Sequence, residues 1–209
     1  MVRGGKHRLG KSTLVAELEK AGFSVLHEPV EKWRSETDDG EKGILEKFYA
    51  DKQKFSFAMQ IAATTSRISA LIAKLRSGSA KKLVVERSFL TDRHVFAMNL
   101  LRSKHLSDTE WDIFLENSKL LEELCKEVFS KCHFMFLFLN TDPATCQARC
   151  VNRDRREEGA AVVDLRYLIE LHDRHCEWLQ SEKMVDHVWT LDGNKNVESV
   201  VKQALKILK

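Results

Sequence analysis

A glycine-rich segment near the start of the chain has the residue types and the spacing needed to hold phosphate groups. Residues 5–12 read GKHRLGKS and fit the pattern GxxxxGK[ST], the P-loop. Glycine is needed there because backbone N–H groups must wrap closely around phosphate oxygens, where a Cβ would intrude. The predicted phosphate-binding residues are Gly5, Lys6, His7, Arg8, Leu9, Gly10, Lys11, Ser12 and Thr13.

The cation and the hydroxyl at the end of this loop have separate expected tasks. A helix that opens near Lys11 would point its positive end at the bound anion. Lys11 would reach the β- and γ-phosphates of a nucleotide, and the Ser12 hydroxyl would join a Mg²⁺ shell. The pattern alone indicates nucleotide phosphates and does not identify the acceptor of any transferred group.

Four further segments combine carboxylates, cations and aromatic residues. Glu28 follows one short β-like run and Glu86 ends the next, and strand ends in an open α/β sheet are where ligands bind. In chain order the segments are EPVEKWR from Glu28, residues 48–67 with Phe48, Tyr49, Gln60 and Arg67, ERS at 86–88 with Asp92 and Phe96 beyond, and the charged run with Arg149, Arg153, Arg155, Glu157 and Glu158.

Strand-like and helix-like segments alternate along the chain, which predicts an α/β fold with a parallel sheet flanked by helices. The β-like runs are 23–27, 82–86, 133–139 and 187–191. Helical spacing covers 44–76, 107–129, a segment from Pro143, and 197–208, while 35–42 reads as a surface loop. Ser107 and Glu110 form a capping-box signature. We expect one domain over 1–209.

The segment ahead of the glycine loop is shorter than this topology requires. A P-loop normally follows a buried central strand of about five residues, yet only Met1, Val2 and Arg3 precede Gly4. Our hypothesis is that the sequence is an N-terminally incomplete version of a longer protein, with its first strand truncated. The alternative is a weaker fold that has lost its middle strand.

Composition excludes several classes of protein. The 209 residues carry a net charge of +3, which argues against overall electrostatic binding of nucleic acid or membrane. The longest apolar run has six residues, Phe134–Leu139, against about 20 for a membrane-spanning helix. Five irregularly spaced cysteines indicate reduced thiols in an intracellular compartment and favour no zinc site. We expect a cytoplasmic protein, or a mitochondrial one if an N-terminal extension is missing.

Taken together and in order, these motifs resemble the deoxyribonucleoside kinases of the deoxycytidine, deoxyguanosine and insect-type family. The motifs are GxxxxGKS, EPVEKW, FxxxxQ with its downstream arginine, ERS followed by Asp, and an arginine-rich lid with LHxxHxxWL. They run from Gly5 to Leu179 and cover nearly the whole chain. The resemblance implies a P-loop kinase fold with an arginine-rich lid at about 149–160.

The resemblance implies a role for each matching residue. Glu28 would be the catalytic carboxylate, Arg87 would neutralise charge near the acceptor oxygen, and Ser12 with Glu86 would hold Mg²⁺. Arg149, Arg153 and Arg155 would be lid arginines that bind ATP. The implied nucleoside-binding residues are Glu28, Trp33, Tyr49, Gln60, Arg67, Arg87, Asp92, Phe96 and Glu158.

The implied reaction moves the γ-phosphate of ATP, or of another nucleoside triphosphate, to the 5′-hydroxyl of a deoxyribonucleoside. An Arg67–Asp92 pair at the base end would favour deoxycytidine, deoxyadenosine or deoxyguanosine over thymidine. The resemblance also suggests a homodimer through the helices at 44–76 and 107–129. Two alternatives are a thymidylate-kinase-like nucleoside monophosphate kinase and a non-catalytic nucleotide-binding relative.

Overall fold

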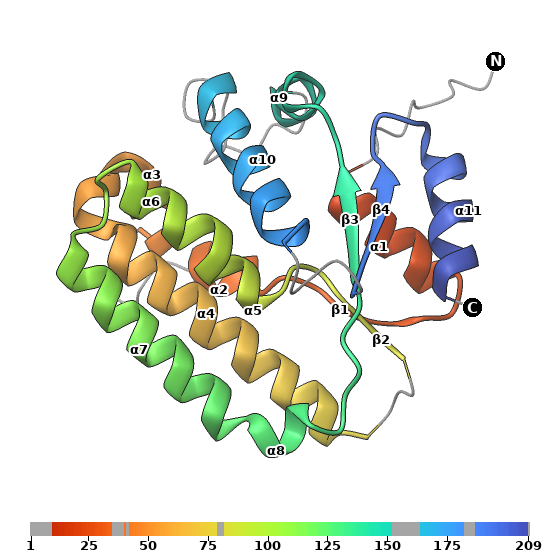
Figure 1. Ribbon diagram of the computed structural model, residues 1–209, viewed down its shortest axis with the longest axis horizontal. Coiled ribbons are helices and arrows are strands. Elements are labelled where there is room, and N and C mark those ends of the chain that lie inside the picture. The colour runs from red at the N-terminus through yellow and green to blue at the C-terminus, as the bar shows by residue number, and fades with distance from the viewer. Residues whose placement is uncertain are drawn as a thin grey trace.

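The computed structural model of the chain describes residues 10–34, 40, 42–78, 82–151, 164–181 and 187–208. Helices surround two pairs of short strands (Figure 1). In chain order the elements are α1 (Lys11–Lys20), β1 (Ser24–Leu26), α2 (Val30–Arg34), α3 (Ile44–Ala50), α4 (Lys52–Arg76), β2 (Leu83–Val85), α5 (Phe89–Thr91), the π-helix η1 (Asp92–Ala97), α6 (Met98–Arg102), α7 (Asp108–Leu124), α8 (Lys126–Phe129), β3 (Phe136–Asn140), α9 (Pro143–Val151), α10 (Leu165–Leu179), β4 (Val188–Asp192) and α11 (Val197–Leu208).

The described strands form two separate parallel pairs, where the sequence predicted one sheet. β1 pairs with β2, aligning Val25 with Val84, and β3 pairs with β4, aligning Phe138 with Thr190. Within the described ranges, β2 and β3 share no ladder hydrogen bonds. The prediction of a single sheet is therefore wrong for this structure, because nothing described bridges the inner edges of the two pairs.

The predicted helix over 44–76 is divided at Asp51. The Asp51 carboxylate accepts a hydrogen bond from the backbone N–H of Lys54 at 3.0 Å, so this residue caps the start of α4. Periodicity did not reveal the break because apolar residues resume at helical spacing on both sides. The helix predicted over 107–129 is likewise divided, at Cys125, into α7 and α8.

Two other expectations have a direct structural outcome. The capping box of α7 is confirmed: Ser107 Oγ accepts from Glu110 N–H at 3.2 Å, and Glu110 Oε2 accepts from Ser107 N–H at 2.8 Å. The strand predicted at 133–139 begins only at Phe136, and Phe134 and Met135 before it are 45% and 40% exposed. An apolar run therefore extended the predicted strand into the surface segment that leads to it.

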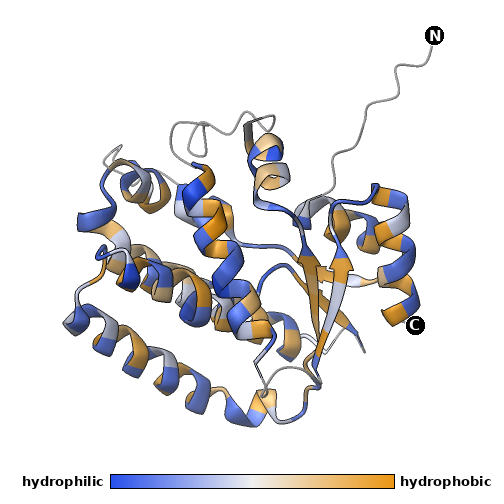
Figure 2. Cartoon of the chain, turned by 45° about the horizontal axis from the view of Figure 1, so that its top comes forward, coloured by the Kyte–Doolittle hydropathy of each residue, from blue (hydrophilic) through white to orange (hydrophobic). Residues whose placement is uncertain are grey.

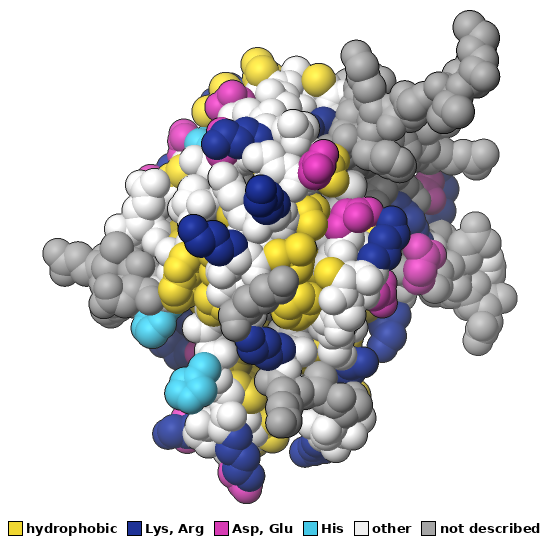
Figure 3. Space-filling view, turned by 90° about the vertical axis from the view of Figure 1, so that its right-hand side faces the viewer, with side chains coloured by type: hydrophobic (Ala, Val, Ile, Leu, Met, Phe, Trp, Pro, Cys, Tyr) yellow, Lys and Arg dark blue, Asp and Glu magenta, His cyan; other side chains and the backbone are white. Residues whose placement is uncertain are grey.

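Apolar side chains gather in separate clusters on the helical side and on the strand side of the molecule. Trp33, Phe48 and Phe114 belong to the cluster among α2, α3, α4 and α7. Leu18, Leu191 and Val200 join α1 and α11 to the β3–β4 pair, whose strands include strongly hydrophobic positions in Figure 2. Viewed from the α11 side, lysine and arginine side chains are scattered among acidic and hydrophobic ones (Figure 3).

Candidate active site

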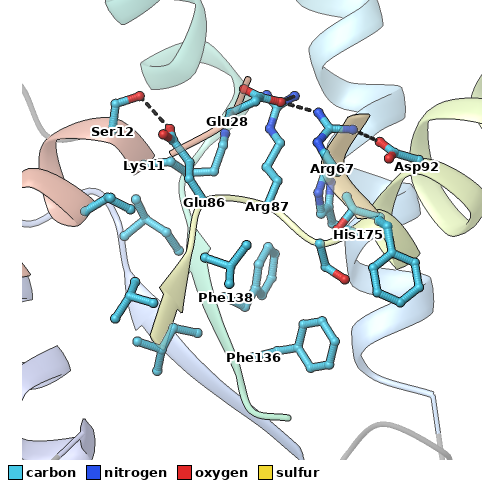
Figure 4. A pocket seen from close by; sticks show the side chains of 18 of the residues that line it. Lys11, Ser12, Glu28, Arg67, Glu86, Arg87, Asp92, Phe136, Phe138 and His175 are labelled. Carbon is cyan, nitrogen blue, oxygen red and sulfur yellow. Dashed lines mark hydrogen bonds and ion pairs between the residues drawn. The ribbon is translucent and has the colours of Figure 1, made fainter. Parts of the chain in front are cut away.

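The start of α1 brings a hydroxyl next to a carboxylate from the end of β2. Gly10 occupies the N-cap with extended backbone, so Lys11 and Ser12 lie in the first helical turn. Ser12 Oγ donates a hydrogen bond to Glu86 Oε1 at 2.7 Å (Figure 4), and Glu86 is only 9% exposed. The predicted helix start and the predicted Ser12–Glu86 neighbourhood are both present. Residues 5–9 of the glycine loop lie outside the described residues.

Glu28 follows β1 and is held by two arginines from different elements. Its Oε1 accepts hydrogen bonds from Arg67 on α4 and from Arg87 Nη1, the latter at 3.2 Å. Its Oε2 makes no hydrogen bond with the described residues. Burial alone would raise the pKa of Glu28, but the charges of Arg87, Arg67 and Lys11 outweigh burial and hold its pKa below the ordinary 4.5. Glu28 is therefore an ionised carboxylate whose Oε2 is open as far as the described residues go.

Arg67 connects Glu28 to a second buried carboxylate. It donates to Asp92, which is 1% exposed and also accepts from Thr64 Oγ1 at 3.3 Å. Burial raises the pKa of Asp92 despite the opposing charges of Arg67 and Arg87. The guanidinium carbon of Arg67 also lies 4.8 Å from the centre of the Trp33 ring. The predicted Arg67–Asp92 pair is thus formed, and the sequence did not indicate its link to Glu28.

The backbone at Arg87 is strained in a way that directs its side chain into the site. Its φ is +67°, a left-handed conformation that costs a non-glycine residue about 1–3 kcal/mol. The guanidinium lies 4.8 Å from the Phe96 ring centre while bonding to Glu28. Burial alone would lower the pKa of Arg87, but the negative charges of Glu28 and Asp92 outweigh burial and raise its pKa above the ordinary value. Arg87 is therefore a cation.

The described groups predicted to bind a nucleoside line the same cavity of about 1440 Å³ as Gly10, Lys11, Ser12 and Arg149 of the predicted phosphate-binding set, whereas Thr13 does not line it. Gln60 is 6% exposed, and its Oε1 is buried without a hydrogen-bond partner among the described residues. A buried amide oxygen left without a donor costs about 1–3 kcal/mol, so it suits a ligand N–H. Tyr49, Trp33 and Phe96 line this cavity too.

Helix α10 contributes two cavity residues that the sequence did not assign to the site. His175 donates from Nδ1 to the Leu171 carbonyl at 2.7 Å. Its ring stacks on the Phe138 ring, with 6.0 Å between the ring centres. Burial lowers the pKa of His175 to about 4, so the ring is neutral at pH 7. Burial raises the pKa of Tyr167 to about 12. His175 belongs to the LHxxHxxWL motif, but the spacing of that motif did not indicate that His175 lines the cavity.

Only part of the predicted lid falls within the structure. Arg149, near the end of α9, lines the cavity and donates from Nη2 to the Gly193 carbonyl at 2.9 Å. Arg153, Arg155 and Glu158 lie outside the described residues. The phosphate clamp by the lid arginines therefore stays a prediction.

The described residues hold neither a candidate membrane-spanning helix nor a cluster of metal-binding side chains. No helix in those ranges is long and apolar enough to cross a membrane. No group of three or more His, Cys, Asp or Glu side chains there could hold a metal ion without other ligands. The Ser12–Glu86 pair nevertheless suits Mg²⁺, because this ion is usually held by one or two protein oxygens together with substrate phosphates and water.

Comparison with known proteins identifies the family. A sequence model of the family described as deoxynucleoside kinase matches residues 4–209. The chain belongs to the deoxynucleoside kinase family. It is therefore an enzyme that phosphorylates nucleosides, and this assignment favours the main sequence prediction over a nucleoside monophosphate kinase.

Individual relatives agree with this assignment. A probable deoxycytidine kinase of Fowlpox virus is 33% identical, over 84% of this chain and 69% of the viral one. Deoxycytidine kinase 2 of Gallus gallus is 33% identical, over 86% of this chain and 73% of its own. A solved deoxyadenosine kinase from M. mycoides with bound dCTP aligns with a TM-score of 0.73 at 22% identity, covering 95% of this chain and 92% of that one. This last likeness supports the kinase fold alone.

Proposed function

We propose that this kinase transfers the γ-phosphate of ATP, or of another nucleoside triphosphate, to the 5′-hydroxyl of a deoxyribonucleoside. The observation that carries the proposal is the arrangement around Glu28. One carboxylate oxygen accepts hydrogen bonds from Arg67 and Arg87, while the other has no hydrogen bond from the described residues, in a cavity that Lys11 and Ser12 also line. An ionised acceptor beside phosphate-binding groups is what an alcohol nucleophile requires.

Glu28 orients the sugar hydroxyl and accepts its proton as the new P–O bond forms. Its low pKa makes it a weak base. That weakness is tolerable because phosphoryl transfer passes through a loose transition state, in which the acceptor needs positioning more than early deprotonation. Arg67 and Arg87 fix the carboxylate from one side, so Oε2 can receive the hydroxyl hydrogen without rotation of the side chain.

Cations and oxygen ligands at the start of α1 and the end of β2 would receive the phosphates. Lys11 would contact the β- and γ-phosphates at the positive end of α1. Ser12 and Glu86 would hold Mg²⁺, which supplies neutralisation of phosphate charge when it is bound. Arg149, Arg153 and Arg155 would close over the donor as a lid. Arg149 donates from Nη2 to the Gly193 carbonyl, and a guanidinium has further N–H donors that could bond a phosphate.

At the other end, an amide and an ion pair would read the base. Gln60 offers an unpaired buried oxygen, and the Arg67–Asp92 pair offers a donor and an acceptor nearby. We propose that this set accepts the amino and carbonyl groups of deoxycytidine, deoxyadenosine or deoxyguanosine more readily than thymidine. Phe96 and Trp33 would pack on base and sugar, while Tyr49 and Glu158 would hold the 3′-hydroxyl.

A nucleoside, rather than a nucleoside monophosphate, is the acceptor that suits Glu28. A monophosphate would bring a second anion to the open oxygen of a carboxylate that is already ionised. Like charges at that distance repel strongly inside a cavity of low dielectric. The uncharged 5′-hydroxyl meets no such repulsion and can donate a hydrogen bond.

We also propose that the kinase forms a homodimer through α4 and α7. Ile113, Leu120 and Leu124 on α7 are 50%, 57% and 71% exposed, and their spacing places them along one face of the helix. Light scattering after size exclusion should give twice the chain mass. Leu120→Glu should shift the population to monomers, whereas Lys195→Glu, a charge change on a different surface, should not.

The experiment that tests the reaction is phosphorylation of the four deoxynucleosides with magnesium and radiolabelled ATP. Glu28→Gln should lower kcat by about 10²–10⁴-fold, the usual contribution of a general base. Glu31→Gln, a change of the same type at an exposed residue of α2, should leave kcat unchanged. Equal rates for Glu28→Gln and the unmodified enzyme would refute the proposed role of Glu28. A parallel assay offers the four deoxynucleoside monophosphates instead, and labelled product from these but from none of the four deoxynucleosides would refute the proposed reaction.

A further inference from the structure

The guanidinium of Arg67 makes both contacts that join the base end of the cavity to the catalytic carboxylate. One Nη atom donates to Asp92 and the other donates to Glu28 (Figure 4). Its Nε is buried and has no hydrogen-bond partner among the described residues. The third nitrogen therefore gives the guanidinium no further anchor there, and its position depends on what packs against its flat face.

The indole of Trp33 packs against that face. The guanidinium carbon of Arg67 lies 4.8 Å from the centre of the Trp33 ring. A cation within about 6 Å of an aromatic ring centre is attracted to the face of the ring, and the attraction is stronger when both groups are removed from water. Trp33 is 4% exposed and Arg67 is 7% exposed. Trp33 is therefore a support for the guanidinium as well as a wall of the cavity.

The helix that carries Trp33 is too short to fix the ring by itself. Helix α2 has five residues, and helices shorter than about 12 residues depend on tertiary contacts for their order. A hydrogen bond to another helix fixes the indole, because Trp33 Nε1 donates to Ser66 Oγ at 2.9 Å. Ser66 precedes Arg67 on α4. The helix that carries the guanidinium therefore also holds the ring that packs on it.

The hydroxyl of Ser66 is already committed to accepting this bond. Its own hydrogen is donated to the carbonyl of Ala63 at 3.1 Å. A hydroxyl has one hydrogen to donate, and an indole N–H can only donate, so the bond from Trp33 forms in one direction. Trp33 and Ala63 belong to the same buried apolar cluster. Loss of the hydroxyl would therefore leave a buried N–H without its acceptor.

We propose that Ser66 is a positioning residue for base recognition and acts through Trp33 and Arg67. Its hydroxyl fixes the indole, and the indole holds the guanidinium in contact with both carboxylates. Ser66 is not among the residues that line the cavity, whereas Trp33 and Arg67 are. The inference rests on the proposed function, which assigns base recognition to the Arg67–Asp92 pair. A loosened indole lets the guanidinium shift, and the pair then no longer presents its donor and acceptor at fixed positions.

Steady-state kinetics with the four deoxynucleosides and magnesium-ATP test this role. Ser66→Ala should lower the preference for the favoured deoxynucleoside over thymidine by about 3–10-fold in relative kcat/KM, the effect of one hydrogen bond of ordinary strength. The kcat should fall for every deoxynucleoside, because Arg67 also holds Glu28, whereas the KM for ATP should stay unchanged. Thr65→Val is the matched control: it removes an exposed hydroxyl from the preceding position of α4 and should change none of these values.

A cycle of variants separates positioning from a general structural effect. Trp33→Phe keeps an aromatic face but removes the N–H, so adding Ser66→Ala to it should cause no further loss of discrimination. An effect of Ser66 that does not pass through the indole would instead give additive losses. In an active enzyme, additive losses, unchanged discrimination in Ser66→Ala or an equal loss in Thr65→Val would each overturn the inference alone. An unmodified enzyme that phosphorylates no deoxynucleoside would refute the proposed function, and this inference with it.

Discussion

Removing the buried pair formed by Arg67 and Asp92 should change the base preference of the enzyme while costing little stability. Arg67 is 7% exposed and Asp92 is 1% exposed, so neither charge can turn to water if its partner is lost. Breaking one side of a buried pair costs about 3–5 kcal/mol. For a chain of this size Arg67→Met alone should therefore lower the Tm by roughly 6–20 °C, because it leaves Asp92 with a hydrogen bond from Thr64 and no direct ion-pair partner among the described residues.

The double variant should cost less than either single change suggests. Replacing both members, as Arg67→Met with Asp92→Leu, removes the two desolvated charges together, and such exchanges are often close to neutral. Urea unfolding of the two single variants and the double variant forms a cycle, in which we expect a coupling of about 3 kcal/mol. If the losses in free energy of unfolding were additive, the interaction between the two side chains would contribute nothing to stability.

The same double variant should shift preference toward thymidine. Without the pair, the base end loses its fixed donor and acceptor, so the discrimination against thymidine should fall by about 10–10²-fold in relative kcat/KM. The kcat should fall for all substrates, because Glu28 then keeps only its bond to Arg87. A folded double variant with unchanged relative kcat/KM values for the four deoxynucleosides would refute the assigned role of the pair.

Three further predictions concern pH and stability. The folded-state pKa of Glu28 is depressed, so its contribution to stability is present above its ordinary 4.5 and is lost as pH falls through the folded value; the stability gap between the unmodified enzyme and Glu28→Gln should shrink in urea titrations below that pH, and a gap that widens contradicts this. Gly193→Ala should lower the Tm by several degrees, since its Cβ would lie 2.9 Å from the Asn140 carbonyl, and an unchanged Tm would show that the β3–β4 end relaxes freely. Ser107→Ala should cost about 0.5–2 kcal/mol in urea unfolding through loss of the α7 cap, and a smaller loss would show that Glu110 alone suffices.

The sequence predicted the groups at strand ends well. Glu28 and Glu86 both follow strands that run in parallel, and the carboxyl ends of parallel strands share one edge of a sheet. That geometric rule places Glu28 and Glu86 at the same edge, where Ser12 at the start of α1 donates to Glu86. Gln60 and Arg67 are seven residues apart on one helix, so their common face followed from helical periodicity alone.

Other features depend on tertiary packing that spacing does not encode. The bond from Arg67 to Glu28 joins α4 to the end of β1, and no motif links those elements. The π-helix that begins at Asp92 widens one turn beside the site, and the left-handed φ of Arg87 arises at a residue type that seldom adopts it. The sequence also did not indicate that β2 and β3 share no hydrogen bonds, which follows from the strand pairing among the described residues.

The most direct test of the account is a crystal structure of the kinase with a deoxynucleoside and a non-hydrolysable triphosphate. The account predicts the 5′-oxygen within about 2.6–3.2 Å of Glu28 Oε2, or joined to it through one water. The same oxygen should lie in line with the terminal phosphate held near Lys11. A 5′-hydroxyl placed beyond the reach of a single water from Glu28, in a complex with both ligands bound, would contradict the central claim.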